Sequence, residues 1–258
     1  MILRPLSQVS ASTSDRSGAR PASAIFIETQ KHVKAPCAII FQAEHSNLAG
    51  QLAEALSEDI FGELSPEVIQ ATGQHDFGWE ASDKGQIEAL GHASPRPFPS
   101  LSPEETIPSW RASVDHSRSM TPIVDVLVSR HFTLLGSGDP GREEFVRSET
   151  ERRKNVERLL PYAPADVDRW TGAVGFCDLL SLYLCSGSHE PAEFPFAHPA
   201  DPAAAKAPKV TLFWNNDSPR FSSPVLKPGS RGSGTAREYS GSGTDLRPLI
   251  LDWSFDQD

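Results

Sequence analysis

The chain has 258 residues and a formal net charge of −10, from 24 Lys and Arg against 34 Asp and Glu. This acidic balance argues against nucleic acid or an anionic membrane as the main partner, because both attract clustered basic side chains. No apolar run approaches the roughly 20 residues of a membrane-spanning helix. Three scattered cysteines form neither a disulfide framework nor a zinc-binding pattern. We therefore expect a soluble, cytoplasmic protein.

The first part of the chain predicts a disordered segment followed by strands. Residues 1–23 are rich in Ser, Arg, Ala and Pro, and we expect them to form a disordered leader. Two apolar runs of strand length follow, Ala24–Thr29 and Cys37–Gln42. These two runs could pair as a hairpin.

A helical periodicity begins at Glu44 and predicts an amphipathic helix that ends near Ser57. Ser65 and Pro66 then supply an N-cap and a first-turn proline for a second helix. This second helix is expected to extend to the dipeptide His75-Asp76.

The middle of the chain predicts a loop and then four more helices. Prolines and glycines indicate a loop over Gly85–Leu101, and the capping box Ser102-Pro103-Glu104-Glu105 begins the third helix. A fourth helix begins at Thr121-Pro122, and mixed charges over residues 142–158 are typical of a solvated helix. The last helix, residues 165–185, is apolar nearly all round, which predicts a place in the centre of the fold.

The tail, residues 186–258, is rich in Pro and Gly. We predict strands at Val210–Trp214 and Leu249–Trp253 and a mobile loop over Gly229–Gly243. The predicted fold is mainly α, a helical bundle with a small accessory antiparallel sheet from the N- and C-terminal segments. We expect a helical metal-binding domain over residues 24–185, with the tail packed against it.

Five ionisable residues fall on the apolar faces of the predicted helices. A lone histidine in such a place is more often a satisfied core residue, and a buried aspartate can simply pair with an arginine such as Arg130. A buried carboxylate costs several kcal/mol unless it is paired or bound to a metal. Taken together, however, these residues form a natural ligand set for a divalent transition metal. They are His45, His75, Asp76, His131 and Asp178.

The order and spacing of four of these residues resemble the H…HD…D signature of the HD-domain superfamily, whose members are helical, metal-binding and mostly phosphohydrolases. More closely, the chain resembles an uncharacterised bacterial family known as domain of unknown function 3891. The segments that carry the resemblance are Phe41–His45, Gln74–Trp79, Ser129–His131 and Asp178–Cys185.

The resemblance implies an HD-like bundle with one or two divalent ions (Mn, Fe or Zn). His45, His75, Asp76 and Asp178 would bind the first ion, and His131 would be one of two extra histidines that bind a second.

The resemblance also implies hydrolysis of a small phosphoester or nucleotide-like substrate. Glu80 or Asp83 would act as general base or orient the water, and Arg130 or Lys84 would neutralise the phosphate. Two alternatives stay open: a di-iron oxygenase of the HD fold acting on a small polar substrate, and a metal-binding sensor domain without catalysis.

Overall fold

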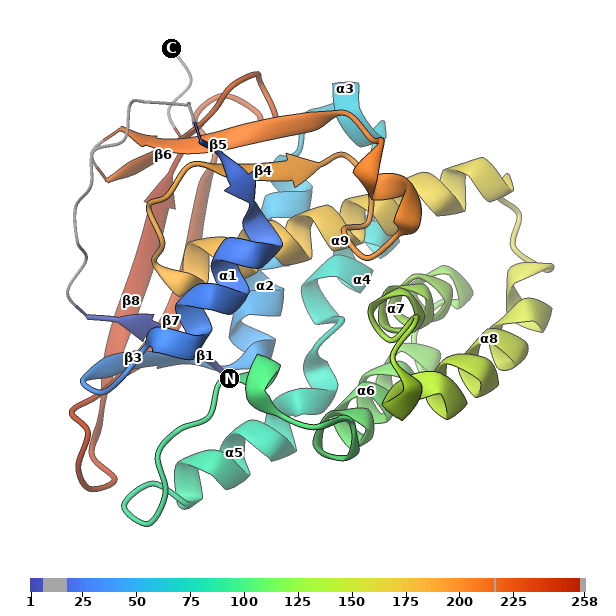
Figure 1. Ribbon diagram of the computed structural model, residues 1–258. Coiled ribbons are helices and arrows are strands. Elements are labelled where there is room, and N and C mark those ends of the chain that lie inside the picture. The colour runs from blue at the N-terminus through green and yellow to red at the C-terminus, as the bar shows by residue number, and fades with distance from the viewer. Residues whose placement is uncertain (7–17, 216, 256–258) are drawn as a thin grey trace.

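Figure 1 shows the computed structural model of the protein, which describes residues 1–6, 18–215 and 217–255. Long helices form much of the described chain. The α-helices are α1 (Ala22–His32), α2 (Gln42–Ala55), α3 (Glu58–Phe61), α4 (Pro66–Gln74), α5 (Glu80–Glu88), α6 (Pro103–Arg118), α7 (Pro122–Leu135), α8 (Glu143–Glu157) and α9 (Pro164–Ser186). Short 3₁₀ helices lie at η1 (Phe77–Trp79), η2 (Phe98–Ser100), η3 (Pro140–Arg142) and η4 (Pro202–Ala205).

The strands form two four-stranded sheets. The first has the order β1-β3-β7-β8 and is antiparallel throughout. The second has the order β2-β4-β5-β6 and is mixed, because β2 runs parallel to β4. The strands are β1 (Ile2–Pro5), β2 (Arg20–Pro21), β3 (Cys37–Ile40), β4 (Ala192–Pro195), β5 (Lys209–Asn215), β6 (Ser218–Phe221), β7 (Arg231–Tyr239) and β8 (Leu246–Ser254).

The prediction of a mainly α bundle with a small accessory sheet is wrong. The chain is about 53% helix and 19% strand, a mixed α/β fold with two sheets. Both sheets pack on the same apolar cluster as α1, α2 and α9. The sheets therefore form a wall of the core rather than an addition to a bundle.

The run Ala24–Thr29, predicted as a strand, lies within helix α1. Its buried residues are Ala22, Ile25, Phe26 and Gln30, spaced three and four apart along one helical face. A short apolar run does not distinguish a strand from a buried helix. The predicted hairpin with the next run does not form, and β3 pairs instead with β1 and β7.

The Gly/Ser-rich stretch Gly229–Gly243, predicted as a mobile loop, contains the nine-residue strand β7 inside the first sheet. Close packing explains one of its glycines. A Cβ on Gly232 would lie 2.8 Å from a methyl group of Leu48 on α2, so a larger residue would push this helix away from the sheet.

The expected disordered leader also has structure at its ends. Met1, Ile2 and Leu3 are buried, and β1 pairs with β3. Arg20–Pro21 pairs with β4. Residues 7–17 lie outside the described part of the chain.

Most of the predicted helices are confirmed. The capping box is present, because Ser102 and Glu105 exchange side-chain and backbone hydrogen bonds at the start of α6. Helix α5 extends into the region predicted as a loop. Helix α9 is buried without interruption from Trp170 to Ser186, and it joins the apolar cluster of the two sheets to a second cluster under α4, α6, α7 and α8.

Among the helices described, none is both long and apolar enough to span a lipid bilayer.

Candidate metal centre

Six ionisable side chains from separate parts of the sequence meet beside the middle of α9. Each of them is at most 6% exposed. His45 lies on α2, His131 on α7 and Asp178 on α9. His75 and Asp76 follow one another at the end of α4, and His198 comes from the segment between β4 and η4.

Close packing of α2 against α4 brings His45 near His75. The two helices cross at glycines, and a Cβ built on Gly50 would lie only 2.8 Å from the Cα atom of Gly73. With no side chain between them, the two imidazole rings reach a centroid separation of 5.4 Å. The end of α4 then places Asp76 beside both rings.

The inner nitrogens of these two histidines face two carboxylates. His45 Nε2 lies 2.8 Å from Asp76 Oδ2, and His75 Nε2 lies 3.3 Å from Asp178 Oδ1. His75 Nε2 is also 3.7 Å from Asp76 Oδ2. The two carboxylates therefore approach the same pair of imidazoles.

The outer nitrogens of the same rings are fixed as donors. His75 Nδ1 lies 2.8 Å from the carbonyl oxygen of Thr72, which can only accept. His45 Nδ1 lies 2.9 Å from the Ser181 hydroxyl, whose own hydrogen is donated to the Asp178 carbonyl oxygen at 2.8 Å. Ser181 must therefore accept from His45. In their neutral forms, His45 and His75 both carry the proton on Nδ1 and turn the lone pair of Nε2 toward the carboxylates.

The carboxylates perturb the titration of this cluster. Burial alone would lower the pKa of His75, but Asp76 and Asp178 outweigh it and raise this pKa to about 9. Burial favours the neutral acid at Asp76, yet His75 and His45 reverse this effect and lower the pKa of Asp76. Without a metal ion, a proton on His75 thus supplies part of the positive charge that the carboxylates require.

These residues fit a metal ion. The Nε2 atom of His75 is buried and makes no hydrogen bond, although a carboxylate oxygen lies 3.3 Å away. Two sets of ligand atoms lie within 4.8 Å of one another: those of His45, His75 and Asp76, and those of His75, His131 and Asp178. Imidazole nitrogen and carboxylate oxygen together suit divalent transition metals such as Mn, Fe and Zn.

A second pair of histidines adjoins the cluster. His198 Nε2 lies 3.0 Å from His131 Nδ1, and His131 Nε2 lies 3.9 Å from Asp178 Oδ2. Burial lowers the pKa of His198 to about 4. Burial, and after it the neighbouring His75, lowers the pKa of His131 as well. Both rings are therefore neutral at physiological pH.

Asp83, predicted as a catalytic acid, is buried in an ion pair with the amino group of Met1, with Oδ1 2.7 Å from the nitrogen. Its other oxygen accepts from the backbone N–H of Gln42 at 2.7 Å. The Gln42 side chain in turn reaches Asp76 Oδ2 at 3.4 Å. Asp83 thus supports the start of α2 near the site, with both oxygens occupied.

The other predicted catalytic residues lie apart from the cluster. Glu80 and Lys84 are exposed and form an ion pair along α5. Arg130 is ion-paired with Glu157 and Asp168 rather than with Asp178. Among the described residues, no hydrogen bond or ion pair joins the side chains of these three residues to the histidine cluster.

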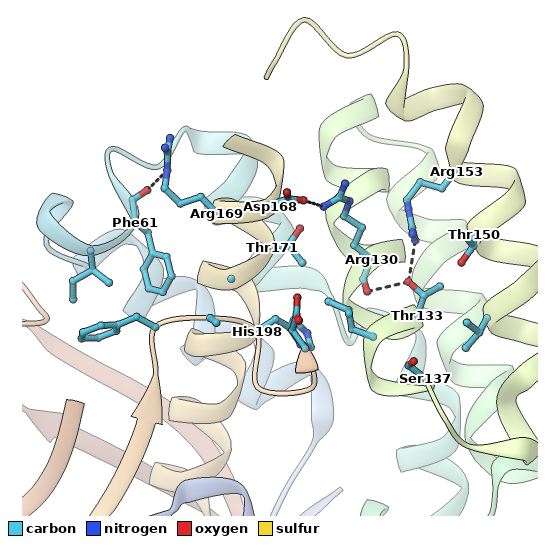
Figure 2. A pocket seen from close by; sticks show the side chains of 17 residues that line it. Phe61, Arg130, Thr133, Ser137, Thr150, Arg153, Asp168, Arg169, Thr171 and His198 are labelled. Carbon is cyan, nitrogen blue, oxygen red and sulfur yellow. Dashed lines mark hydrogen bonds and ion pairs between the residues drawn. The ribbon is translucent and has the colours of Figure 1, made fainter. Parts of the chain in front are cut away.

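Arg130 lines a cavity of about 560 Å³ that reaches the cluster from the α7–α8–α9 side. Figure 2 shows this cavity, with Arg130, Arg153 and Thr133 on one side and His198 below them. Arg153 donates to the hydroxyl groups of Ser129 and Thr133. Of the six clustered residues, His198 lines this cavity, and its ring contacts His131.

Sequence reasoning identified five of the six clustered residues and missed His198. The segment around His198 has no periodicity that would relate it to the helices. The supporting role of Ser181 was missed as well, although its position three residues after Asp178 on a buried helix is a usable signal, since residues three apart share a helix face.

Comparison with known proteins gives a family but no described relative. Neither the curated proteins nor the solved structures contain a match to this chain. Residues 27–237, which include all six clustered residues, match the family described as "Protein of unknown function (DUF3891)". The chain belongs to the DUF3891 family.

Proposed function

We propose that the protein is a metal-dependent hydrolase of the HD type that acts on a small phosphoester or nucleotide-like substrate. The observation that carries the proposal is the fixed orientation of two buried histidines. Thr72 and Ser181 hold the N–H groups of His75 and His45 outward, so the Nε2 lone pairs of the neutral rings face Asp76 and Asp178. Ligating histidines in proteins are oriented by hydrogen bonds of this kind.

His45, His75, Asp76 and Asp178 would hold the ion. When bound, a divalent ion polarises a phosphoryl oxygen and lowers the pKa of water. The residues of the chain orient the ligands and exclude bulk water from them. The ion would also supply the local positive charge that an acidic protein needs in order to attract an anionic substrate.

The cavity shown in Figure 2 is large enough to hold a small substrate. Its volume of about 560 Å³ lies within the usual range of ligand pockets. The guanidinium groups of Arg130 and Arg153 offer donors to phosphate oxygens. Arg130 is ion-paired with Asp168, whose side chain is 68% exposed. Because this pair is open to solvent, a substrate phosphate would bind Arg130 beside Asp168.

Hydrolysis is favoured over the di-iron alternative by the second histidine pair. A second ion would need lone pairs from two further histidines, and His131 and His198 are bonded to each other instead. The two buried aspartates support a bound cation in a hydrolase and in a metal-binding sensor domain alike, because buried carboxylates are costly without a cation. The phosphatase screen below distinguishes these two functions.

Metal analysis combined with a phosphatase screen tests the proposal. The purified chain is loaded with Mn²⁺, Zn²⁺ or Fe²⁺, its metal content is measured, and hydrolysis of phosphomonoesters, phosphodiesters and nucleotides is assayed. We expect bound metal and hydrolysis of one class, both lost in His75→Ala. His92→Ala, which removes an exposed histidine, is the matched control. A protein that binds no metal, or that binds metal and hydrolyses no phosphoester, contradicts the proposal.

A further inference from the structure

We propose that His198 is a positioning residue that fixes His131 as a hydrogen-bond donor to the centre, not as a metal ligand. The inference rests on the proposed function for the presence of an ion, while the state of the two rings rests on hydrogen bonds alone. It assigns a role to a histidine outside the H…HD…D pattern, on a segment far from the helices in sequence.

The direction of the hydrogen bonds follows from the backbone. The N–H group of Ala200 donates to His198 Nδ1 at 3.2 Å, so this nitrogen carries no proton. The proton of the neutral His198 ring is therefore on Nε2, and it is donated to His131 Nδ1 at 3.0 Å. His131 Nδ1 is then an acceptor, and the proton of His131 must be on Nε2.

His131 consequently differs from His45 and His75 in what it presents to the centre. The outer nitrogens of His45 and His75 are donors, which leaves inner lone pairs for a metal ion. The outer nitrogen of His131 is an acceptor, which leaves an inner N–H group. To bind a metal through Nε2, His131 would have to place its proton on Nδ1, and His198 would then direct an N–H group at the N–H of Ala200.

The inner N–H group of His131 has no strong partner in Asp178. The distance from His131 Nε2 to Asp178 Oδ2 is 3.9 Å, beyond a hydrogen bond. The donor is thus available to an oxygen atom of a bound substrate. A phosphoryl oxygen is the acceptor that the proposed function supplies.

The fold provides a specific seat for His198. A Cβ built on Gly175 of α9 would lie 2.4 Å from Cδ2 of His198 and 2.7 Å from its Cγ. Only a glycine at this position lets the ring rest on the helix beside His131. His198 also borders the cavity in Figure 2, so it lies between the solvent-accessible space and the donor that it orients.

Nuclear magnetic resonance of ¹⁵N-histidine-labelled full-length protein tests the inference, because ring nitrogen shifts report which nitrogen carries the proton. In the metal-free protein we expect both His131 and His198 to be protonated on Nε2. After addition of ¹¹³Cd²⁺, a scalar coupling to the metal should appear for nitrogens of His45 and His75 and not for His131. A proton on Nδ1 of His131, or a coupling between cadmium and His131, would overturn the inference.

Two pairs of variants separate positioning from folding. His198→Ala should release His131 into a mixture of the two protonated forms, and His198→Gln, whose amide can still donate, should restore the Nε2 form. Gly175→Ala should act like His198→Ala because its Cβ displaces the ring. Gly85→Ala, whose Cβ would meet no atom within 4 Å, is the control for a glycine-to-alanine change away from His198.

The metal affinity gives an independent readout. His131→Ala should change the dissociation constant of Cd²⁺ by less than about tenfold, because loss even of a hydrogen-bond partner behind a ligand typically costs about 10–100-fold. A loss of more than about 100-fold in His131→Ala would show that His131 is a ligand. If wild-type protein binds no Cd²⁺, the proposed function fails, while the protonation states of His131 and His198 in metal-free protein still decide this inference.

Discussion

Replacement of Asp178 by asparagine should abolish metal-dependent stabilisation while leaving the metal-free protein about as stable as wild type. Asp178 lies in the most buried helix, and its carboxylate is 3.3 Å from His75 Nε2 and 4.0 Å from His45 Nδ1. Asparagine keeps the shape of the side chain and removes its charge. The substitution therefore tests whether this carboxylate serves the fold or an ion.

In the metal-free protein two opposing effects nearly cancel. At an effective dielectric constant of about 20, unit charges 3.3 Å apart attract by about 5 kcal/mol. Removing a buried carboxylate also removes a desolvation cost of several kcal/mol. His75 keeps Asp76 as a partner, with its Nε2 3.7 Å from Asp76 Oδ2. We expect a net change in unfolding free energy of no more than about 1–2 kcal/mol.

With metal present the two proteins should differ clearly. Free metal at 100 times the dissociation constant adds about 2.7 kcal/mol of stability. For a chain of this length this corresponds to a rise in Tm of about 5–11 °C. If Asp178→Asn weakens binding about 100-fold, the gain falls to about 0.4 kcal/mol and the rise in Tm to about 1–2 °C.

Differential scanning calorimetry with and without Mn²⁺ or Zn²⁺, after treatment with a chelator, measures both quantities. Asp168→Asn, an exposed aspartate on the same helix, is the matched control and should keep the metal-dependent rise. An Asp178→Asn protein that unfolds in the absence of metal would show that the carboxylate serves the fold. An unchanged metal-dependent rise would show that Asp178 is not a ligand.

Three further predictions concern pH and packing. Asp76 and Asp178 raise the pKa of His75 from 6.5 to about 9. Protonated His75 therefore stabilises the metal-free fold fully below pH 6.5, and this stabilisation is lost as the pH rises through 9. The Tm measured with a chelator should fall across this range, and a constant Tm would contradict the assignment. Gly78→Ala places a Cβ 2.2 Å from the backbone nitrogen of Ser113, so urea unfolding should show a loss of about 3 kcal/mol. Gly85→Ala, within helix α5 and with open space for its Cβ, should instead gain about 0.4–1 kcal/mol. Asp83→Asn leaves the buried amino group of Met1 without its partner and should cost about 3–5 kcal/mol in the same assay, and an unchanged stability would refute this ion pair.

Local sequence signals were reliable where they belong to one helix. The cap at Ser102, the proline at Pro122 and the continuous apolar character of α9 each predict a helix that the structure contains. These signals act within a few residues, since capping and helical periodicity depend on neighbours in the same segment. The same periodicity placed His45, His131 and Asp178 on buried faces.

Local signals failed where distant segments decide the structure. Ala24–Thr29 is compatible with either a strand or a buried helix, and its packing against α9 makes it a helix. Arg231–Tyr239 contains glycines that suggest a loop, and pairing with β3 and β8 makes it a strand. The second sheet, whose first two residues come from the expected leader, depends on contacts across most of the chain.

The sequence by itself determined which residue types form the candidate metal centre. Imidazole and carboxylate groups on apolar helical faces are destabilising unless a cation or hydrogen bonds compensate them. Only the tertiary structure decided which nitrogen each histidine presents. Thr72, Ser181 and Ala200 fix the protons of His75, His45 and His198, and each of these contacts is a hydrogen bond whose direction a sequence does not state. The hydrogen-bond partners of the outer ring nitrogens therefore decide whether each histidine presents a lone pair or an N–H group to the centre.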